Sequence, residues 1–322
     1  MGGWTLSLGR RMRSFRVTRL ALAGVVSSLG GCELEEITIA DVENVVLAEI
    51  YLDIGADRSD NVARAFLHRT VGVADVESLP PLTDAVVTMT RGDGFSFPLF
   101  PEDTDDCLES SPIEEPGACF VADAATAFID PGDLVEVLVE LPGGGEIRGA
   151  TRVPGGFDLV EIPNVCSLPP DALMTVEWSS AAEAWAYLSE TSIRGLPNAL
   201  RPEGIIVLDD PLYLLGLSVS DADTTVVFPS EFGIFNRFDL DADLAVRLQR
   251  GLPAGSTAEI SITALDRNGV NWSRGGNFNP SGQVRVPSLS GDGTGVFAST
   301  VSRGFDVLVT NQPSGLPACP LD

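Results

Sequence analysis

Short apolar segments that alternate with polar residues constrain this chain more than any other feature. Alternation with a period of two places apolar side chains on one face of a strand and polar side chains on the other. Gly, Pro, Asp and Asn separate these segments at intervals typical of β-sandwiches. The clearest segments are residues 44–54, 64–73, 84–92, 133–142 and 144–154. The pattern predicts an all-β chain.

Two segments of the second half carry helical signals of different strength. Residues 171–188 contain several alanines, but the bulky side chains in this stretch favour two strands around a turn over a helix: Val176, Trp178, Trp185 and Tyr187. Residues 239–250 begin with good N-cap residues and predict one helical segment.

The organisation of the first 31 residues is that of an export signal. Five arginines and no acidic residue accompany an apolar run that ends at Cys32. This run is too short to span a membrane, which takes about 20 apolar residues. Leu29-Gly30-Gly31-Cys32 resembles the lipobox of bacterial lipoproteins, in which the cysteine is acylated and becomes the mature N-terminus. The resemblance implies lipidation of Cys32 and anchoring in the cell envelope, on the periplasmic or surface face of the outer membrane. The alternative is an ordinary signal peptide with an incidental cysteine.

A change of pattern in a proline-rich stretch near residues 152–172 predicts a domain boundary. We expect a signal peptide over 1–31, an N-terminal β-sandwich over 32–157, a linker over 158–164 and a C-terminal β-sandwich over 165–322.

The charge of the chain limits its partners. The 46 acidic residues face 20 basic ones, all arginine, and five of these arginines lie within residues 1–31. The remainder therefore has 46 acidic and 15 basic residues, a formal net charge of −31. Such a surface repels nucleic acids and anionic lipids. Cations, neutral glycans and proteins stay open as partners.

Four cysteines follow Cys32, and an even number in an exported chain predicts disulfides. Three pairings are possible, and we favour Cys107–Cys119 and Cys166–Cys319. The first pair is close in sequence, and the second joins the beginning and the end of the C-terminal half. The chain has no C-x-x-C spacing, which disfavours a cysteine metal site.

Several stretches resemble known exported modules. Residues 128–154, with Pro131-Gly132-Asp133, an alternating strand, a Gly-rich hairpin and a closing A-T-x-V-P, resemble transthyretin-like or carboxypeptidase-regulatory-like sandwiches. Together with the lipobox and the A-V-V strand, they also resemble the lipoproteins of the domain of unknown function 4249 family. Residues 175–180 and 251–269 are similar to parts of a fibronectin type III sandwich, although its corner tyrosine is missing.

Calcium is the one cofactor that the acidic residues suggest, because it takes oxygen ligands from carboxylates and carbonyls. The spacing Asp239-x-Asp241-x-Asp243 is the candidate metal site, without the glycine and closing glutamate of an EF-hand. Three further acidic clusters are Asp53, Asp57 and Asp60; Asp103, Asp105 and Asp106; and Asp221 and Asp223. Solvated surface carboxylates and loop caps are the simpler interpretation, so we otherwise expect no cofactor.

Signals for catalysis are weak. Nucleophilic catalysis commonly uses a histidine base, and the only histidine, His68, lies in a predicted strand. Trp178, Trp185 and Trp272 at strand spacing favour core positions over a sugar platform. Gly291, Gly293 and Gly295 precede no lysine or helix start, so they predict a hairpin and no phosphate loop.

These observations predict a non-enzymatic, lipid-anchored binding or scaffolding protein of the bacterial cell envelope. The family resemblance implies an accessory subunit of a TonB-dependent outer-membrane receptor, which is a β-barrel protein. The alternatives are an independent surface adhesin or glycan-binding protein and, more distantly, a carboxylate-based envelope hydrolase.

Overall fold

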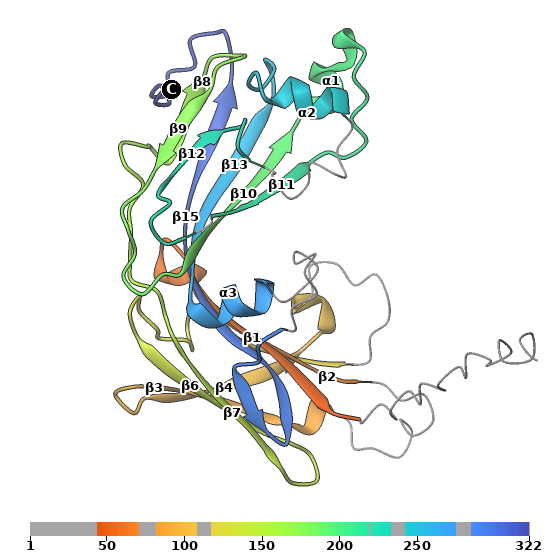
Figure 1. Ribbon diagram of the computed structural model, residues 1–322, viewed down its shortest axis with the longest axis vertical. Coiled ribbons are helices and arrows are strands. Elements are labelled where there is room, and N and C mark those ends of the chain that lie inside the picture. The colour runs from red at the N-terminus through yellow and green to blue at the C-terminus, as the bar shows by residue number, and fades with distance from the viewer. Residues whose placement is uncertain are drawn as a thin grey trace, which may run out of the picture. The chain divides into compact units, whose positions relative to one another are not determined.

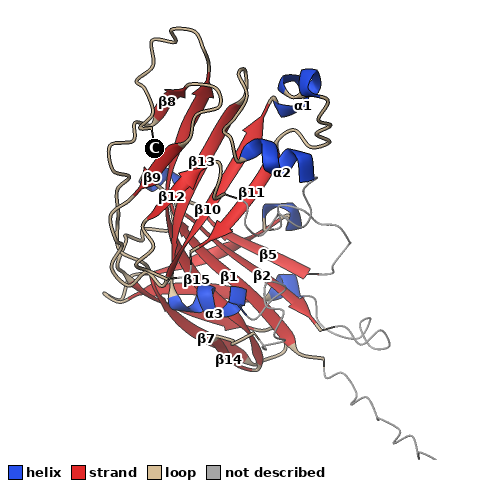
Figure 2. Ribbon diagram, turned by 45° about the horizontal axis from the view of Figure 1, so that its top comes forward, coloured by secondary structure: helices blue, strands red, loops and turns tan. Residues whose placement is uncertain are grey.

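The fold is all-β. The computed structural model describes residues 44–70, 82–107, 117–218, 220–232, 242–274 and 285–321. It contains a 13-stranded sheet and a 2-stranded sheet, and Val42–Asp322 form one compact unit. Figure 2 shows that strands dominate and that the helices are short. The prediction of an all-β chain is confirmed.

Each of the five predicted N-terminal strands is present. In Val46–Ile54 (β1) every second side chain is buried, as the alternation predicts. Neighbours along the sheet run β1-β2-β5-β4-β3-β6-β7. The other strands are Val62–Arg69 (β2), Val86–Arg91 (β3), Ser96–Glu102 (β4), Gly117–Ala122 (β5), Leu134–Glu140 (β6) and Glu146–Arg152 (β7). The short 3-10 helices Arg58–Asp60 (η1), Leu82–Asp84 (η3) and Thr104–Asp106 (η4) lie between them.

The last strand, Gly293–Val309 (β15), joins the two halves of the chain (Figure 1). Its first part pairs in parallel with β1, and the short strand Leu289–Gly291 (β14) pairs with both β7 and β15. This closes nine strands into a ring, so that neither β1 nor β7 is left as an open edge. Residues 289–301, which the sequence placed in a C-terminal domain, thus pair with strands of the N-terminal one.

The remainder of β15 belongs to the second part of the fold. There it pairs with Thr257–Leu265 (β13) and Val165–Leu168 (β8). Ala186–Arg194 (β10) and Leu212–Leu217 (β11) extend the sheet beyond β13. Met174–Glu177 (β9) and Thr225–Phe228 (β12) form the 2-stranded sheet. Buried side chains of both sheets belong to one hydrophobic core.

Helices are few in the described part of the chain. Ala242–Leu248 (α2) lies within the helical segment predicted from residues 239–250. Leu196–Ala199 (α1), the 3-10 helix Arg201–Glu203 (η5) and Arg267–Arg274 (α3) carry no clear sequence signal. Among the described residues, no helix has the length and apolar character needed to cross a membrane.

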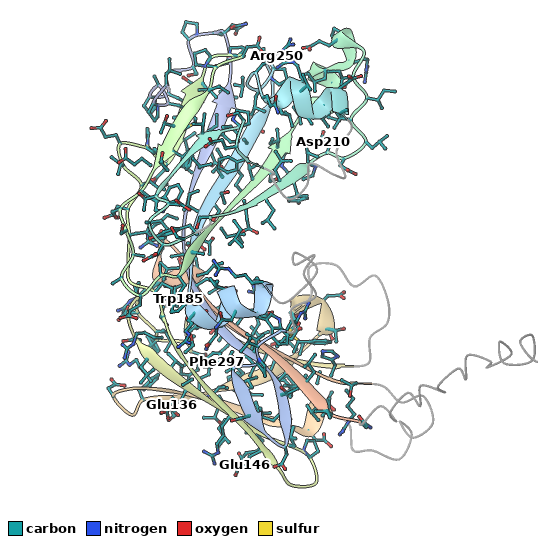
Figure 3. The ribbon with its side chains drawn as sticks, in the orientation of Figure 1. Glu136, Glu146, Trp185, Asp210, Arg250 and Phe297 are labelled. Carbon is teal, nitrogen blue, oxygen red and sulfur yellow. A yellow bond between two sulfur atoms is a disulfide. The ribbon has the colours of Figure 1, made fainter. Side chains whose placement is uncertain are left out.

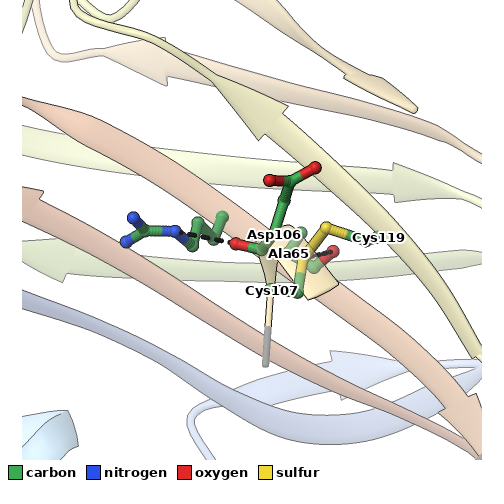
Figure 4. The surroundings of a disulfide bond; sticks show 5 residues. Ala65, Asp106, Cys107 and Cys119 are labelled. Carbon is green, nitrogen blue, oxygen red and sulfur yellow. Dashed lines mark hydrogen bonds between the residues drawn. A yellow bond between two sulfur atoms is a disulfide. The ribbon is translucent and has the colours of Figure 1, made fainter. Parts of the chain in front are cut away.

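Both predicted disulfides are present. Cys107–Cys119 has an S–S distance of 2.07 Å, and Cys166–Cys319 has one of 2.04 Å. Figure 4 shows the first of them beside β2, where the Arg64 guanidinium donates a hydrogen bond of 3.1 Å to the carbonyl of Asp106. The second disulfide ties β8 to the C-terminal segment.

Candidate functional site

The candidate site is a cavity of about 380 Å³ between the 2-stranded sheet and the β10–β11 hairpin. Strand β10 contributes Tyr187 and Ser189. Trp178 follows β9 directly, and its backbone N–H donates to the carbonyl of Thr224 at 3.0 Å. The remaining lining comes from β11, β12 and the segments beside them: Gly216, Leu217, Ser218, Asp223, Thr225, Val226 and Glu231.

Two aromatic rings form the inner wall of the cavity. Trp178 and Tyr187 are 4% and 2% exposed, and their rings meet edge to face with centroids 5.3 Å apart. The hydroxyl of Tyr187 accepts a hydrogen bond of 2.8 Å from the backbone N–H of Ala181. Burial raises the pKa of this hydroxyl above its ordinary value. The wall is thus a rigid apolar surface made by core residues.

The indole N–H of Trp178 is buried and donates to no acceptor. Within the described residues it is the only buried side-chain nitrogen or oxygen without a hydrogen-bond partner. A buried polar group without a partner costs about 1–3 kcal/mol, so most are satisfied.

Hydroxyl groups surround the aromatic wall. The Ser218 hydroxyl accepts a hydrogen bond of 2.7 Å from the backbone N–H of Tyr187 and donates one of 2.9 Å to the carbonyl of Ser220. The Ser189 hydroxyl donates to the carbonyl of Gly216 at 3.3 Å. These bonds hold β10 and the end of β11 in place around the cavity.

The charged groups at the cavity are both acidic. One carboxylate oxygen of Glu231 accepts from the backbone N–H of Val227 at 2.7 Å, and Asp223 accepts from that of Ser220 at 3.1 Å. Both side chains therefore stay at the rim with an oxygen held by the backbone. Within the described part of the chain, no arginine lines the cavity. These two carboxylates disfavour anions in their immediate surroundings.

The structure distributes the other predicted site residues over the fold. Cys32, Asp239 and Asp241 lie outside the described residues, and Asp243 lies in the first turn of α2. No group of three or more His, Cys, Asp or Glu side chains suited to a metal ion occurs within the described ranges. Of the other acidic clusters, Asp53 accepts hydrogen bonds from Arg64 and Thr300, and Asp223 belongs to the cavity.

The remaining aromatic candidates have separate surroundings. His68 is half-buried on β2 and stacks on Phe66 with ring centroids 5.3 Å apart. Trp185, labelled in Figure 3, is 43% exposed under the guanidinium of Arg267. Trp272 on α3 is half-buried beneath Arg285. Only Trp178 of the three tryptophans lines the cavity.

Sequence reasoning identified Trp178 as a core residue and Asp223 as an acidic loop residue, but did not bring them together. Their proximity follows from the pairing of β9 with β12, in which Thr225 lies opposite Glu177. Glu231 and Ser189 carry no local signal of a site. The cavity is recognisable because Trp178, whose indole N–H is buried without a hydrogen-bond acceptor, lies near two carboxylates. This combination is visible only in the folded structure.

Comparisons with known proteins identify no family. No family model matches the chain, and no curated protein matches it. Among solved structures, IG1+IG2 of DIP-gamma aligns with 83% of this chain and 99% of its own, at 8% identity and a TM-score of 0.18. A chimeric titin Z1Z2 tandem aligns with 80% of this chain and 99% of its own, at 9% identity and a TM-score of 0.18. The two tandem V-type regions of VCBP3 align with 79% of this chain and 99% of their own, at 8% identity and a TM-score of 0.17. Similarity at these TM-scores carries no argument about function.

Proposed function

We propose that the chain is a lipid-anchored, non-enzymatic binding or scaffolding protein of the bacterial cell envelope, and that the Trp178 cavity is its ligand site. The single observation that carries the binding role is a cavity of about 380 Å³ that is lined by the aromatic pair Trp178 and Tyr187 together with polar side chains. A volume of this size lies within the range of small-molecule sites.

The anchor is proposed from the sequence. Basic residues, a short apolar run and Leu29-Gly30-Gly31-Cys32 support acylation of Cys32. A single acyl chain holds a protein only weakly, whereas several chains hold it stably. The proposed location is the outer membrane, with the described residues outside the lipid.

A non-enzymatic role agrees with the chemistry of the cavity lining. It includes hydroxyls and carboxylates but no histidine, and His68 lies on β2. The pair Asp223 and Glu231 is the one feature that favours the hydrolase alternative, because glycosidases use two carboxylates. A hydrolase would release new reducing ends from a glycan, and a binding protein would not.

The family resemblance supports a more specific proposal, in which the protein is an accessory subunit of a TonB-dependent outer-membrane receptor. The test is to purify the native protein from mild-detergent membranes and to identify co-eluting proteins by mass spectrometry. A receptor in stoichiometric amount supports the accessory role. Elution without a partner contradicts it and favours an independent adhesin or glycan-binding protein.

A matched variant separates anchoring from folding in the same experiment. Cys32→Ser removes the acylated thiol and leaves every described residue unchanged. We expect this variant to leave the membrane fraction while retaining both disulfides. If Cys32→Ser stays as membrane-bound as the wild type, the lipid-anchor proposal is wrong.

A further inference from the structure

We propose that the outer face of the large sheet, over β10, β13, β15 and β8, binds an extended segment of a partner protein that presents a basic side chain next to an aliphatic one. These four strands are consecutive neighbours in the sheet (Figure 1). A groove of about 360 Å³ runs across them, and Leu316 of the C-terminal segment forms part of its wall.

The groove is separate from the Trp178 cavity. Ser192 and Arg194 of β10 line the groove, whereas Tyr187 and Ser189 of the same strand line the cavity. Successive residues of a strand point to opposite faces of its sheet. The groove and the cavity therefore lie on opposite faces of β10, and this proposal goes beyond the ligand site proposed above.

One row of side chains across the strands forms the centre of the groove. Ser192 lies opposite Glu259, Glu259 opposite Asp306, and Asp306 opposite Val165. The residues on either side of Glu259 and Asp306 in β13 and β15 are buried in the core: Ala258, Ile260, Phe305 and Val307. The row therefore faces away from the core.

Two exposed carboxylates, those of Glu259 and Asp306, lie directly opposite each other within this row. Side chains in this relation have Cβ atoms about 4.5–5.5 Å apart, and like charges there repel each other. Arg194 lies opposite Thr257 and thus diagonal to Glu259, so it offsets at most one of the two charges. A cation placed over both carboxylates reduces their repulsion.

An apolar end of the groove lies beside the carboxylates. Val165 on β8 and Leu316 in the C-terminal segment are 40% and 36% exposed, and both line the groove. The Cys166–Cys319 disulfide and two backbone hydrogen bonds of Ser167, of 2.8 and 3.0 Å, hold this segment against β8. A wall that is fixed before binding loses little conformational entropy when a partner binds.

The spacing of these groups fits an extended chain that crosses the strands. Neighbouring strands lie about 4.8 Å apart, so β8 is about 7 Å from the midpoint between β13 and β15. Residues i and i+2 of an extended chain are also about 7 Å apart, and their side chains point the same way. A basic residue over Glu259 and Asp306 thus places the residue two positions further on over Val165 and Leu316.

Charge and shape decide among the possible occupants. The chain has 46 acidic and 20 basic residues, so a second copy of it meets net repulsion. Calcium takes six to eight oxygen ligands and makes no use of the apolar end. A partner segment with a lysine or arginine two positions from a leucine uses both parts of the groove.

The experiment measures the fluorescence anisotropy of dye-labelled peptides with the full-length protein in mild detergent. The probe Ala-Lys-Ala-Leu-Ala, blocked at both ends, has its basic and aliphatic side chains two positions apart. Ala-Glu-Ala-Leu-Ala reverses the charge, and Ala-Lys-Ala-Ser-Ala removes the aliphatic group. We expect the first peptide to bind about 10-fold more tightly than either control, and added salt to weaken its binding because exposed ion pairs are screened.

A variant and its matched control locate the binding. Glu259→Gln should lower the affinity for the lysine–leucine peptide about 3- to 5-fold, as expected for an exposed ion pair. The same variant should raise the urea midpoint of unfolding, because it ends the repulsion between Glu259 and Asp306. A carboxylate with a purely structural role would not combine these effects. Glu136→Gln alters an exposed carboxylate on β6 (Figure 3) and should change neither quantity.

The outcomes are distinguishable. Weaker peptide binding with a higher unfolding midpoint in Glu259→Gln, and neither in Glu136→Gln, supports the proposal. Equal weakening in both variants shows general attraction to an acidic chain and overturns it. Spermidine that binds as tightly as the lysine–leucine peptide assigns the groove to simple cations, and self-association that Glu259→Gln abolishes assigns it to a second copy. Either result, or no binding of the peptide at millimolar concentration, also overturns the proposal.

Discussion

The hydroxyl of Thr151 donates a hydrogen bond of 2.5 Å to the carboxylate of Asp266, which lies 115 residues further along the chain. The Thr151 hydroxyl is also 2.8 Å from that of Ser299, and the backbone N–H of Gly269 donates to Asp266 at 2.8 Å. This buried network connects β7, β15 and the start of α3. Burial raises the pKa of the Asp266 carboxyl above its ordinary value.

The raised pKa predicts a pH dependence of stability. Above about pH 4, Asp266 loses its proton in the unfolded chain. In the folded chain the same carboxyl keeps its proton until the pH reaches the higher pKa of the folded state. The folded state then binds more protons, so the free energy of unfolding falls as pH rises through this window. Asp266→Asn lacks this contribution. Urea unfolding between pH 4 and 8 should show wild-type stability falling relative to Asp266→Asn, and parallel curves would contradict the account.

Gly295 allows β1 and β15 to pair, and a side chain there should break the ring of strands. A Cβ at this position would lie 1.9 Å from the carbonyl oxygen of Ala48, and φ is +139°. We expect Gly295→Ala to cost several kcal/mol, in the range of the largest single-residue effects. Gly94→Ala is the matched control, because φ is +90° and no atom lies within 4 Å. Equal losses in thermal unfolding would show that the β1–β15 contact is not the cause.

The two disulfides should differ in their contribution to stability. The cysteines of Cys166–Cys319 are 153 residues apart, and those of Cys107–Cys119 are 12 apart. In the chain-entropy model the long loop is worth about 5 kcal/mol and the short one about 3 kcal/mol. Paired Cys→Ser variants, compared by denaturant unfolding, should show the larger loss for Cys166 and Cys319. The reverse order would contradict this model.

Arg247 is a buried cation that fastens α2 to the segments around it. Its guanidinium donates to Asp171 at 2.6 Å, to Glu203 at 2.8 Å and to the carbonyl of Gly251 at 2.9 Å. Arg247→Ala should cost about 1–3 kcal/mol, because these bonds are lost while the two exposed carboxylates regain water. Arg247→Lys should recover only part of this, since an ammonium lacks the planar fork.

An exposed ion pair provides the control for Arg247. Arg148 pairs with Glu146 on the surface of β7, where both side chains are largely exposed. Surface pairs of this kind contribute little, so Arg148→Ala should leave the unfolding midpoint unchanged. A loss as large as that of Arg247→Ala would show that burial does not decide the effect.

The sequence predicts the strands well because their signal is local. The alternation in residues 44–54 and 133–142 corresponds to β1 and β6, and the pairing of the four cysteines follows from their positions. The return of β14 and β15 to the N-terminal strands is not local. In the folded chain, β15 pairs with β1 and β14 pairs with β7, which provides hydrogen-bond partners for the backbone of both strands. The residues near 289–301 contain no local pattern that predicts these partners.

The cavity shows the same limit. Trp178 is identifiable as a core residue from its strand, and the sequence favoured that interpretation. Its lack of a hydrogen-bond partner depends on what packs around the ring after folding. The positions of Asp223 and Glu231 beside it depend on the β9–β12 pairing and on the segments that flank β12. Patterns along a chain do not contain this information.

The most direct test of the central claim is the mass of the mature N-terminal peptide, taken from protein purified out of bacterial membranes. The account predicts a peptide that begins at Cys32 and carries the added mass of several acyl chains, and Cys32→Ser should yield no such peptide. A peptide cleaved elsewhere, with an unmodified Cys32 thiol, would contradict the lipid-anchored function.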